Sequence, residues 1–323
     1  MRHNALFRRG AALLALLLLL AALGGCAAQD NSAAPADGRL RVVATIFPPY
    51  DFARQLGGDR VDAVMLAAPG TEAHDFIPSL ADMETIAGCD LFLYVGGSMD
   101  AWVAQVLDSL GDRAPRALAI SSLVATVTEE LPAGAEDHEE HDGHDGEDEI
   151  DEHVWTSPQN AIAICRGIAA ELAALDPAHQ ADYEARLTDY CAQLQTLDDT
   201  FHEVMAQSVR QTVVFAERFP FRYLADELGL TCYAAFAGCS SDTEPSLATV
   251  ARLTSVVEAQ QLPVVFYLEF SDQTLADTIC QATGAQKRML HSCHNVSPED
   301  FAAGVTYLQL MQQNIANLRA ALQ

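Results

Sequence analysis

Short apolar runs alternate with longer stretches of helical periodicity along most of this chain. In the first half the apolar runs are RVVATI at 41–46, VDAVML at 61–66 and DLFLYV at 90–95. Runs of this length predict strands that are buried on both faces. The stretches between and after them predict helices: PYDFARQL, PSLADMETIAG and MDAWVAQVLDSL. Strands separated by helices predict a mainly parallel sheet that is covered on both faces.

A second series of the same kind begins at residue 211. Its apolar runs are QTVVFA, TCYAAF, PVVFYLE and KRML, and SLATVARLTSVVEAQ at 246–260 predicts a helix between two of them. About 285 residues follow position 39, which exceeds one comfortable hydrophobic core. We therefore expect an α/β fold with two lobes, an N-terminal lobe at 40–178 and a C-terminal lobe at 208–323.

A long amphipathic stripe separates the two series. Large apolar residues recur at steps of four and three: Tyr183, Leu187, Tyr190, Leu194, Leu197, Phe201 and Val204. This spacing predicts one helix at 179–207, about 42 Å long at ~1.5 Å per residue. A coiled-coil segment is the alternative, but a single stripe beside two α/β units favours a helix that bridges the lobes. A similar stripe predicts a last helix from Glu299, through Phe301 and Val305 to Leu322.

The first residues have the organisation of an export signal. Arg2, Arg8 and Arg9 precede the apolar run AALLALLLLLAAL, which is shorter than the ~20 residues that span a membrane. LGGC at 23–26 resembles the lipobox of bacterial lipoproteins. We expect residues 1–25 to be removed, Cys26 to carry a lipid, and 26–39 to form a tether.

The net charge and the cysteine count limit which molecules this protein can bind and how its cysteines are used. The formal charge is −27, and removal of three arginines with the signal gives −27 − 3 = −30. Such a surface repels nucleic acid and anionic lipid headgroups, and it attracts cations. Seven of the eight cysteines remain after Cys26, an odd number with no CxxC spacing, so most are expected to be buried free thiols.

Histidines are concentrated in one acidic segment and in three separate loops. The segment 136–149 has nine acids and the histidines His138, His141 and His144, with almost no apolar residue. We expect a mobile loop at 133–150 that gathers zinc weakly, or else a merely solvated charge run.

The other histidine-bearing loops follow predicted strands or precede a helix. They carry His74, His153, and the pair His291 and His294. Parallel α/β folds place ligands at such strand ends, and imidazole binds zinc well and manganese when carboxylates share the sphere. These loops from both halves therefore predict a metal site in the cleft between the lobes.

Three motifs resemble the metal-binding lipoproteins of bacterial zinc and manganese ABC importers. They are GTEAHDFIPS at 70–79, YVGGSMDAWV at 94–103 and DEHVWTSPQNA at 151–161. The resemblance covers nearly all of the mature chain. It implies two α/β lobes joined by a long helix, with His74 and His153 as the first two metal ligands. An acidic histidine loop just before the last motif is typical of zinc-specific members.

The second half departs from that family pattern. Its third histidine ligand corresponds to Arg218 in ERFPFRYLADELGL, and arginine cannot ligate a cation. The family's fourth ligand, an acid, corresponds to His291. We therefore expect a rearranged site in which His291 or His294 joins His74 and His153. Glu217 and Glu244 are possible additional ligands, and Glu217, Glu244 and Glu269 are candidates to neutralise Arg218.

The resemblance implies a monomeric extracytoplasmic receptor that is anchored by lipid to the cell membrane. Such a receptor captures Zn²⁺ and delivers it to an ABC import permease; a manganese or iron receptor of the same family is the alternative. A secreted zinc hydrolase is disfavoured, because HEEH at 138–141 is one residue short of HExxH and His202-Glu203 has no second histidine four residues after His202. We expect a binding protein and no enzyme.

Overall fold

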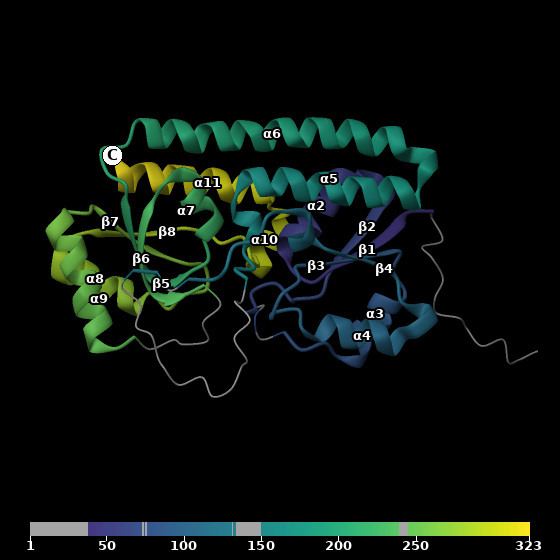
Figure 1. Ribbon diagram of the computed structural model, residues 1–323, viewed down its shortest axis with the longest axis horizontal. Helices are drawn as coiled ribbons and strands as arrows, with labels where there is room; N and C mark the ends of the chain where they lie inside the picture. The colour runs from purple at the N-terminus through teal and green to yellow at the C-terminus, as the bar shows by residue number, and fades with distance from the viewer. Residues whose placement is uncertain (1–37, 73, 75, 131, 134–149, 239–244) are drawn as a thin grey trace, which may run out of the picture. The chain divides into compact units, whose positions relative to one another are not determined.

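Two four-stranded parallel sheets organise the protein (Figure 1). The computed structural model describes residues 38–72, 74, 76–130, 132–133, 150–238 and 245–323, all within one compact unit at 34–323. The first sheet has the strand order β2-β1-β3-β4 and the second β6-β5-β7-β8. The strands of the first are β1 (Leu40–Ala44), β2 (Val61–Met65), β3 (Leu91–Tyr94) and β4 (Arg116–Ala119). Those of the second are β5 (Thr212–Phe219), β6 (Thr231–Ala237), β7 (Val264–Tyr267) and β8 (Gln286–Met289).

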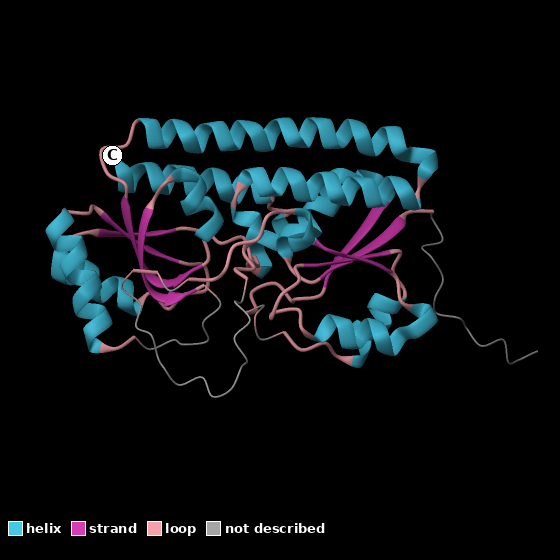
Figure 2. Cartoon of the chain, in the orientation of Figure 1, coloured by secondary structure: helices cyan, strands magenta, loops and turns pink. Residues whose placement is uncertain are grey.

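Helices cover both faces of each sheet (Figure 2). In the first lobe they are α2 (Phe47–Gly57), α3 (Leu80–Ala87), α4 (Trp102–Leu110) and α5 (Pro158–Leu175). In the second they are α7 (Arg222–Leu228), α8 (Leu247–Gln260), α9 (Thr274–Thr283) and α11 (Tyr307–Leu322), whereas α10 (Pro298–Ala303) lies beside α2. The long helix α6 (Gln180–Ala206) runs along both lobes (Figure 1). The prediction of two parallel α/β lobes joined by a long helix is confirmed. Among the described residues, none of the helices has the length and hydropathy of a membrane-spanning segment.

The strands β1 and β5 contain apolar runs because their two faces meet two different cores. In β1, Val42 packs in the large central cluster, whereas Val43 packs with the side chains below α3 and α4. In β5, Phe215 belongs to the same central cluster and Val214 to a separate one below α8 and α9. The central cluster is therefore shared by both lobes.

The stripe predicted for α6 is the face that this shared core buries. Tyr183, Tyr190, Leu194, Leu197, Phe201 and Val204 are all buried, and α6 packs on α5 of the first lobe and α11 of the second. These contacts confirm the interpretation as a bridging helix rather than a coiled coil.

Two details differ from the sequence-based expectation. Strand β4 was not predicted, because its four residues RALA are half-exposed or exposed and form a sheet edge. The last helix is two helices instead of one: Gly304 ends α10 at φ +72°, and Thr306 begins α11 with a capping box to Gln309. The apolar stripe continues across the break, which is why periodicity alone concealed it.

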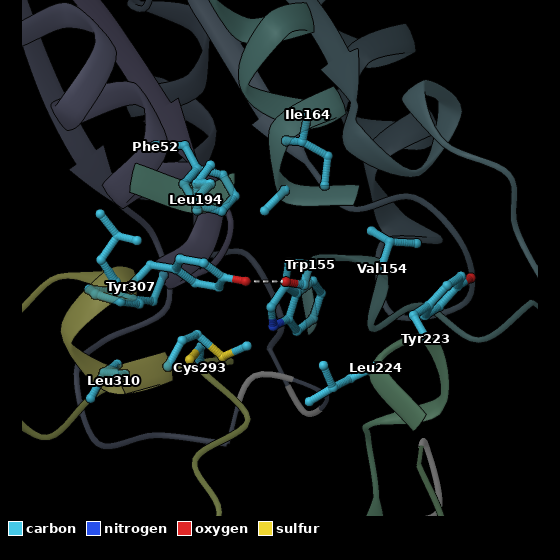
Figure 3. Packing of buried hydrophobic residues seen from close by; sticks show 14 of the residues in the cluster. Phe52, Val154, Trp155, Ile164, Leu194, Tyr223, Leu224, Cys293, Tyr307 and Leu310 are labelled. Atoms are coloured by element: carbon cyan, nitrogen blue, oxygen red, sulfur yellow. Dashed lines mark hydrogen bonds between the residues drawn. The ribbon is translucent and has the colours of Figure 1, made fainter. Parts of the chain in front are cut away.

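Hydrogen bonds between buried side chains and backbone join the two lobes. The Trp155 indole donates to the Ser292 carbonyl at 2.8 Å, and the Tyr307 hydroxyl donates to the Trp155 carbonyl at 2.7 Å (Figure 3). Both rings are fully buried. The loop that carries His153 is thereby fixed against the loop that carries His294.

Candidate metal centre

Three of the predicted histidines converge from separate loops. His74 follows β2, His153 lies immediately before the short 3-10 helix Val154–Thr156 and α5, and His294 follows β8. The ring centroids of His74 and His294 are 4.6 Å apart. The ring centroid of His153 lies 5.5 Å from that of His74 and 5.6 Å from that of His294. One nitrogen of each ring lies within 4.8 Å of the others. Ligand atoms around tetrahedral zinc are ~3.3 Å apart for ~2.0–2.1 Å bonds, so small side-chain rotations would allow all three to bind one ion.

The space between these rings suits an ion rather than an organic substrate. The three histidines line a cavity of about 30 Å³, together with Glu72, Arg218 and Glu269 among others. A single water needs about 10–15 Å³ on the same kind of measure. The cavity therefore has room for an ion with at most one or two waters, and too little room for an organic substrate.

Burial keeps two of the imidazoles neutral. Burial, reinforced by the His153 charge, lowers the pKa of His74 to about 3. Burial and the neighbouring His74 likewise hold the pKa of His294 well below its ordinary value. Neutral imidazole is the form that binds a metal, so these residues have their lone pairs available at neutral pH.

His153 is oriented by the carboxylate of Asp151. Burial alone lowers the pKa of His153, but the hydrogen bond and charge of Asp151 outweigh it and the pKa ends above the ordinary value. Asp151 Oδ1 lies 3.1 Å from His153 Nδ1 and also accepts from its backbone N–H at 2.9 Å. A carboxylate on one ring nitrogen fixes the tautomer that leaves the other nitrogen for a metal.

His294 is held by contacts that run through Ser292 to Glu269, which lies just after β7. Its backbone N–H donates to Ser292 Oγ at 3.1 Å, and the Ser292 N–H donates to Glu269 Oε2 at 2.8 Å. Its Nε2 lies 3.1 Å from the sulfur of Met99, a neighbour that the sequence analysis missed. Met99 belongs to the motif YVGGSMDAWV, where Asp100 accepts from the Val95 and Gly96 amides at 2.5 Å and 3.1 Å. That motif therefore shapes one wall of the histidine cluster.

Arg218 pairs with Glu72, which was not among the carboxylates expected to neutralise it. The two side chains, 146 positions apart, meet at 2.5 Å. Burial raises the pKa of Glu72, but Arg218 outweighs it and the net shift is downward. Glu72 is part of the motif GTEAHDFIPS, but nothing in the sequence connects it with Arg218. The pair offsets the positive charge of Arg218 at the edge of the cavity.

The other predicted site residues are not in the histidine cluster. His291 Nδ1 accepts the Cys293 N–H at 2.9 Å, and Asn314 of α11 bonds both its backbone N–H and carbonyl at 2.8 Å and 2.7 Å. Glu217 accepts a hydrogen bond from Ser271 Oγ and does not line the cavity. Of the two late histidines, the structure thus brings only His294 to the cluster, and the roles as metal ligands remain predictions.

Several predictions fall on residues that the structure does not describe. Glu244, Cys26, Cys239 and the loop histidines His138, His141 and His144 lie outside the described residues. Six cysteines of the described part are free thiols: Cys89, Cys165, Cys191, Cys232, Cys280 and Cys293.

Two α/β lobes joined by a long helix, with an imidazole cluster between strand-end loops, are the architecture of a metal-ion-binding protein. Residues 42–321 match the family described as "Zinc-uptake complex component A periplasmic". The chain belongs to this family. Membership agrees with the prediction of a binding protein and not of a hydrolase.

Relatives of known description extend the comparison. The chain is 30% identical to the high-affinity zinc uptake system protein ZnuA of Bacillus subtilis, over 98% of this chain and 99% of that protein. It is 32% identical to the zinc-binding lipoprotein AdcA of Streptococcus pneumoniae over 88% of this chain, but it spans only 56% of AdcA.

Solved structures agree in fold. The metal-dependent lipoprotein YcdH from Bacillus subtilis superposes with a TM-score of 0.75 at 28% identity, covering 88% of this chain and 100% of that one. The Zn(II)-bound ZnuA-like domain of Streptococcus pneumoniae AdcA gives 0.73 at 29% identity, covering 88% and 99%.

Proposed function

We propose that this protein captures Zn²⁺ between His74, His153 and His294 and, acting as a monomer, delivers it to an ABC import permease. The observation that carries the proposal is the convergence of three imidazoles on a cavity of ion size. The names of the relatives, which refer to zinc binding and zinc uptake, support the same function.

The donor set favours zinc over manganese or iron. Three imidazole nitrogens suit Zn²⁺, whereas Mn²⁺ prefers oxygen-rich sites. Glu72 and Glu269 line the same cavity and can supply a carboxylate oxygen to a fourth position. Zinc accepts such a mixed set in tetrahedral geometry.

Metal analysis of the mature chain, purified without added metal, tests this function. We expect zinc to copurify and to remain bound when free Mn²⁺ or Fe²⁺ is in excess, because nitrogen donors bind Zn²⁺ more tightly than either. A competition titration with a chromophoric chelator gives the affinity. Tighter binding of Mn²⁺ than of Zn²⁺ would instead favour a manganese receptor.

We further propose that the mature chain is held at the outer face of the cell membrane by a lipid on Cys26. LGGC at 23–26, directly after an apolar run, supports this anchor. Replacing Cys26 with serine is expected to move the protein from the membrane fraction to the soluble fraction, because serine cannot form the thioether. Cys89→Ser, which alters a buried thiol of the first lobe, serves as the control. Unchanged membrane retention of the Cys26 variant would remove the anchor from the proposal.

A further inference from the structure

A second group of metal-type side chains lies on the bridging helix, outside the histidine cluster. Asp198 and His202 are one turn apart on α6 and therefore share a face. Glu227 reaches the same place from α7. One ligand-type atom from each residue lies within 4.8 Å of the others.

Each carboxylate in this group leaves one oxygen without a donor. Asp198 is 4% exposed; its Oδ2 accepts from Gln159 and Gln195 at 2.5 Å and 3.0 Å. Glu227 Oε2 accepts from the Ser157 hydroxyl at 2.5 Å. Asp198 Oδ1 and Glu227 Oε1 are buried and have no hydrogen-bond partner. Leaving such atoms buried and unpaired is costly, more so when they carry charge.

The two orphan oxygens face the same imidazole nitrogen. His202 Nε2 lies 3.8 Å from Asp198 Oδ1 and 3.8 Å from Glu227 Oε1. These separations are too long for hydrogen bonds. They are close to the ~3.3 Å between ligand atoms of a tetrahedral zinc ion. The His202 side chain is half exposed, so an ion can reach the group from solvent.

The two neighbouring carboxylates, Asp198 and Glu227, also favour a bound cation. Burial, together with the neighbouring Asp198, raises the pKa of Glu227 to about 7. A proton on one carboxyl and a metal ion between both are the two ways to relieve this repulsion. A proton shared by the two carboxyls would need no third group. A metal ion would need one, and the His202 imidazole provides it on the exposed side of the pair.

We propose that Asp198, His202 and Glu227 form a second site for a divalent transition-metal ion, with Zn²⁺ as its occupant. Water would complete the coordination at the exposed side. This second site is separate from the cluster of His74, His153 and His294, and the proposal does not depend on zinc binding there. Because Ser157 begins α5 and bonds Glu227, an ion here would tie α5, α6 and α7 together.

Zinc titration of the full mature chain tests the second site. His202→Ala and Glu227→Gln are each expected to bind one zinc ion fewer than the parent, while the tightest ion is retained. The acidic segment 136–149 is present in every chain, so ions bound there cancel in the difference. His202 is exposed enough for its removal to spare the fold, and Glu227→Gln retains a side chain of the same size.

His179→Ala is the matched control. His179 is also a surface histidine at the bridging helix, but among the described residues it contacts a single carboxylate, that of Asp176, at 2.7 Å. This variant is expected to bind as many ions as the parent. If the His202 and Glu227 variants also match the parent in stoichiometry and affinity, the group holds a shared proton and the second site is refuted. If the proposed transport site is wrong, the parent itself would bind no zinc ion tightly. That result is distinct from the loss of one ion in the His202 and Glu227 variants.

Discussion

Replacing His294 with asparagine is expected to weaken zinc binding by about 100- to 1,000-fold. Structural zinc sites with four ligands release about 10–16 kcal/mol, which is roughly 2.5–4 kcal/mol per ligand. Each ~1.4 kcal/mol changes the dissociation constant tenfold. His294 is buried beside His74 and His153, so its replacement leaves the ion one imidazole short. Competition titration against a chelator of known affinity measures the change.

His291→Asn is the matched control, three residues away in the same loop. The amide oxygen of asparagine can take over the hydrogen bond that His291 Nδ1 accepts from the Cys293 N–H. We expect this variant to bind zinc within a few-fold of the parent. The opposite result, a severe loss in His291→Asn with parent-like binding in His294→Asn, would make His291 the ligand and our assignment wrong.

Removing the carboxylate of Asp51 is expected to lower the free energy of unfolding by about 2–3 kcal/mol, because a buried backbone N–H loses its acceptor and a partly exposed arginine loses its counter-charge. Asp51 is fully buried on α2. Its Oδ1 accepts from Arg54 at 2.7 Å, and its Oδ2 accepts from the Tyr307 N–H, at the start of α11, at 2.8 Å. Arg54 itself donates to the Val305 carbonyl at 2.9 Å. Asp51→Ala thus removes a link between the lobes and leaves Arg54 without its partner.

Urea unfolding of the zinc-free mature chain measures this loss, since bound zinc would add its own stabilisation. Asp182→Ala is the control. Asp182 pairs with Arg60 at 3.4 Å, but both side chains are about half exposed, and such pairs contribute at most about 1 kcal/mol. Equal effects of the two substitutions would mean that the Asp51 network adds nothing to the stability of the fold.

The fold could be predicted from the sequence wherever burial dictates a pattern. Both faces of β1 and β5 are buried, so their apolar runs were recognisable, and the stripe of α6 was regular over its whole length. β4 lacked that signal because it is a half-exposed edge. The break at Gly304 was missed because the residues on either side still face the core.

The sequence could predict which loops form the site, but not whether His291 or His294 of the last loop joins it. His291 and His294 lie in one irregular loop, and only its backbone decides which of them faces His74. Cys293 between them has φ +62°, and Asn314 fixes the His291 backbone from a distant helix. The Arg218–Glu72 pair depends on contact between segments 146 positions apart, which single-sequence reasoning cannot detect.

The Trp155 link also constrains how the ion can come and go. A hinge motion that separated the lobes would expose this indole, at a cost of about 5 kcal/mol for ~200 Å² of apolar surface, and would break its bond to Ser292. His153 and His294 are therefore both buried and linked through the Trp155–Ser292 contact, whereas His74 is only partly buried. We expect the ion to enter and leave on the His74 side, through a movement of His74 while His153 and His294 keep their positions.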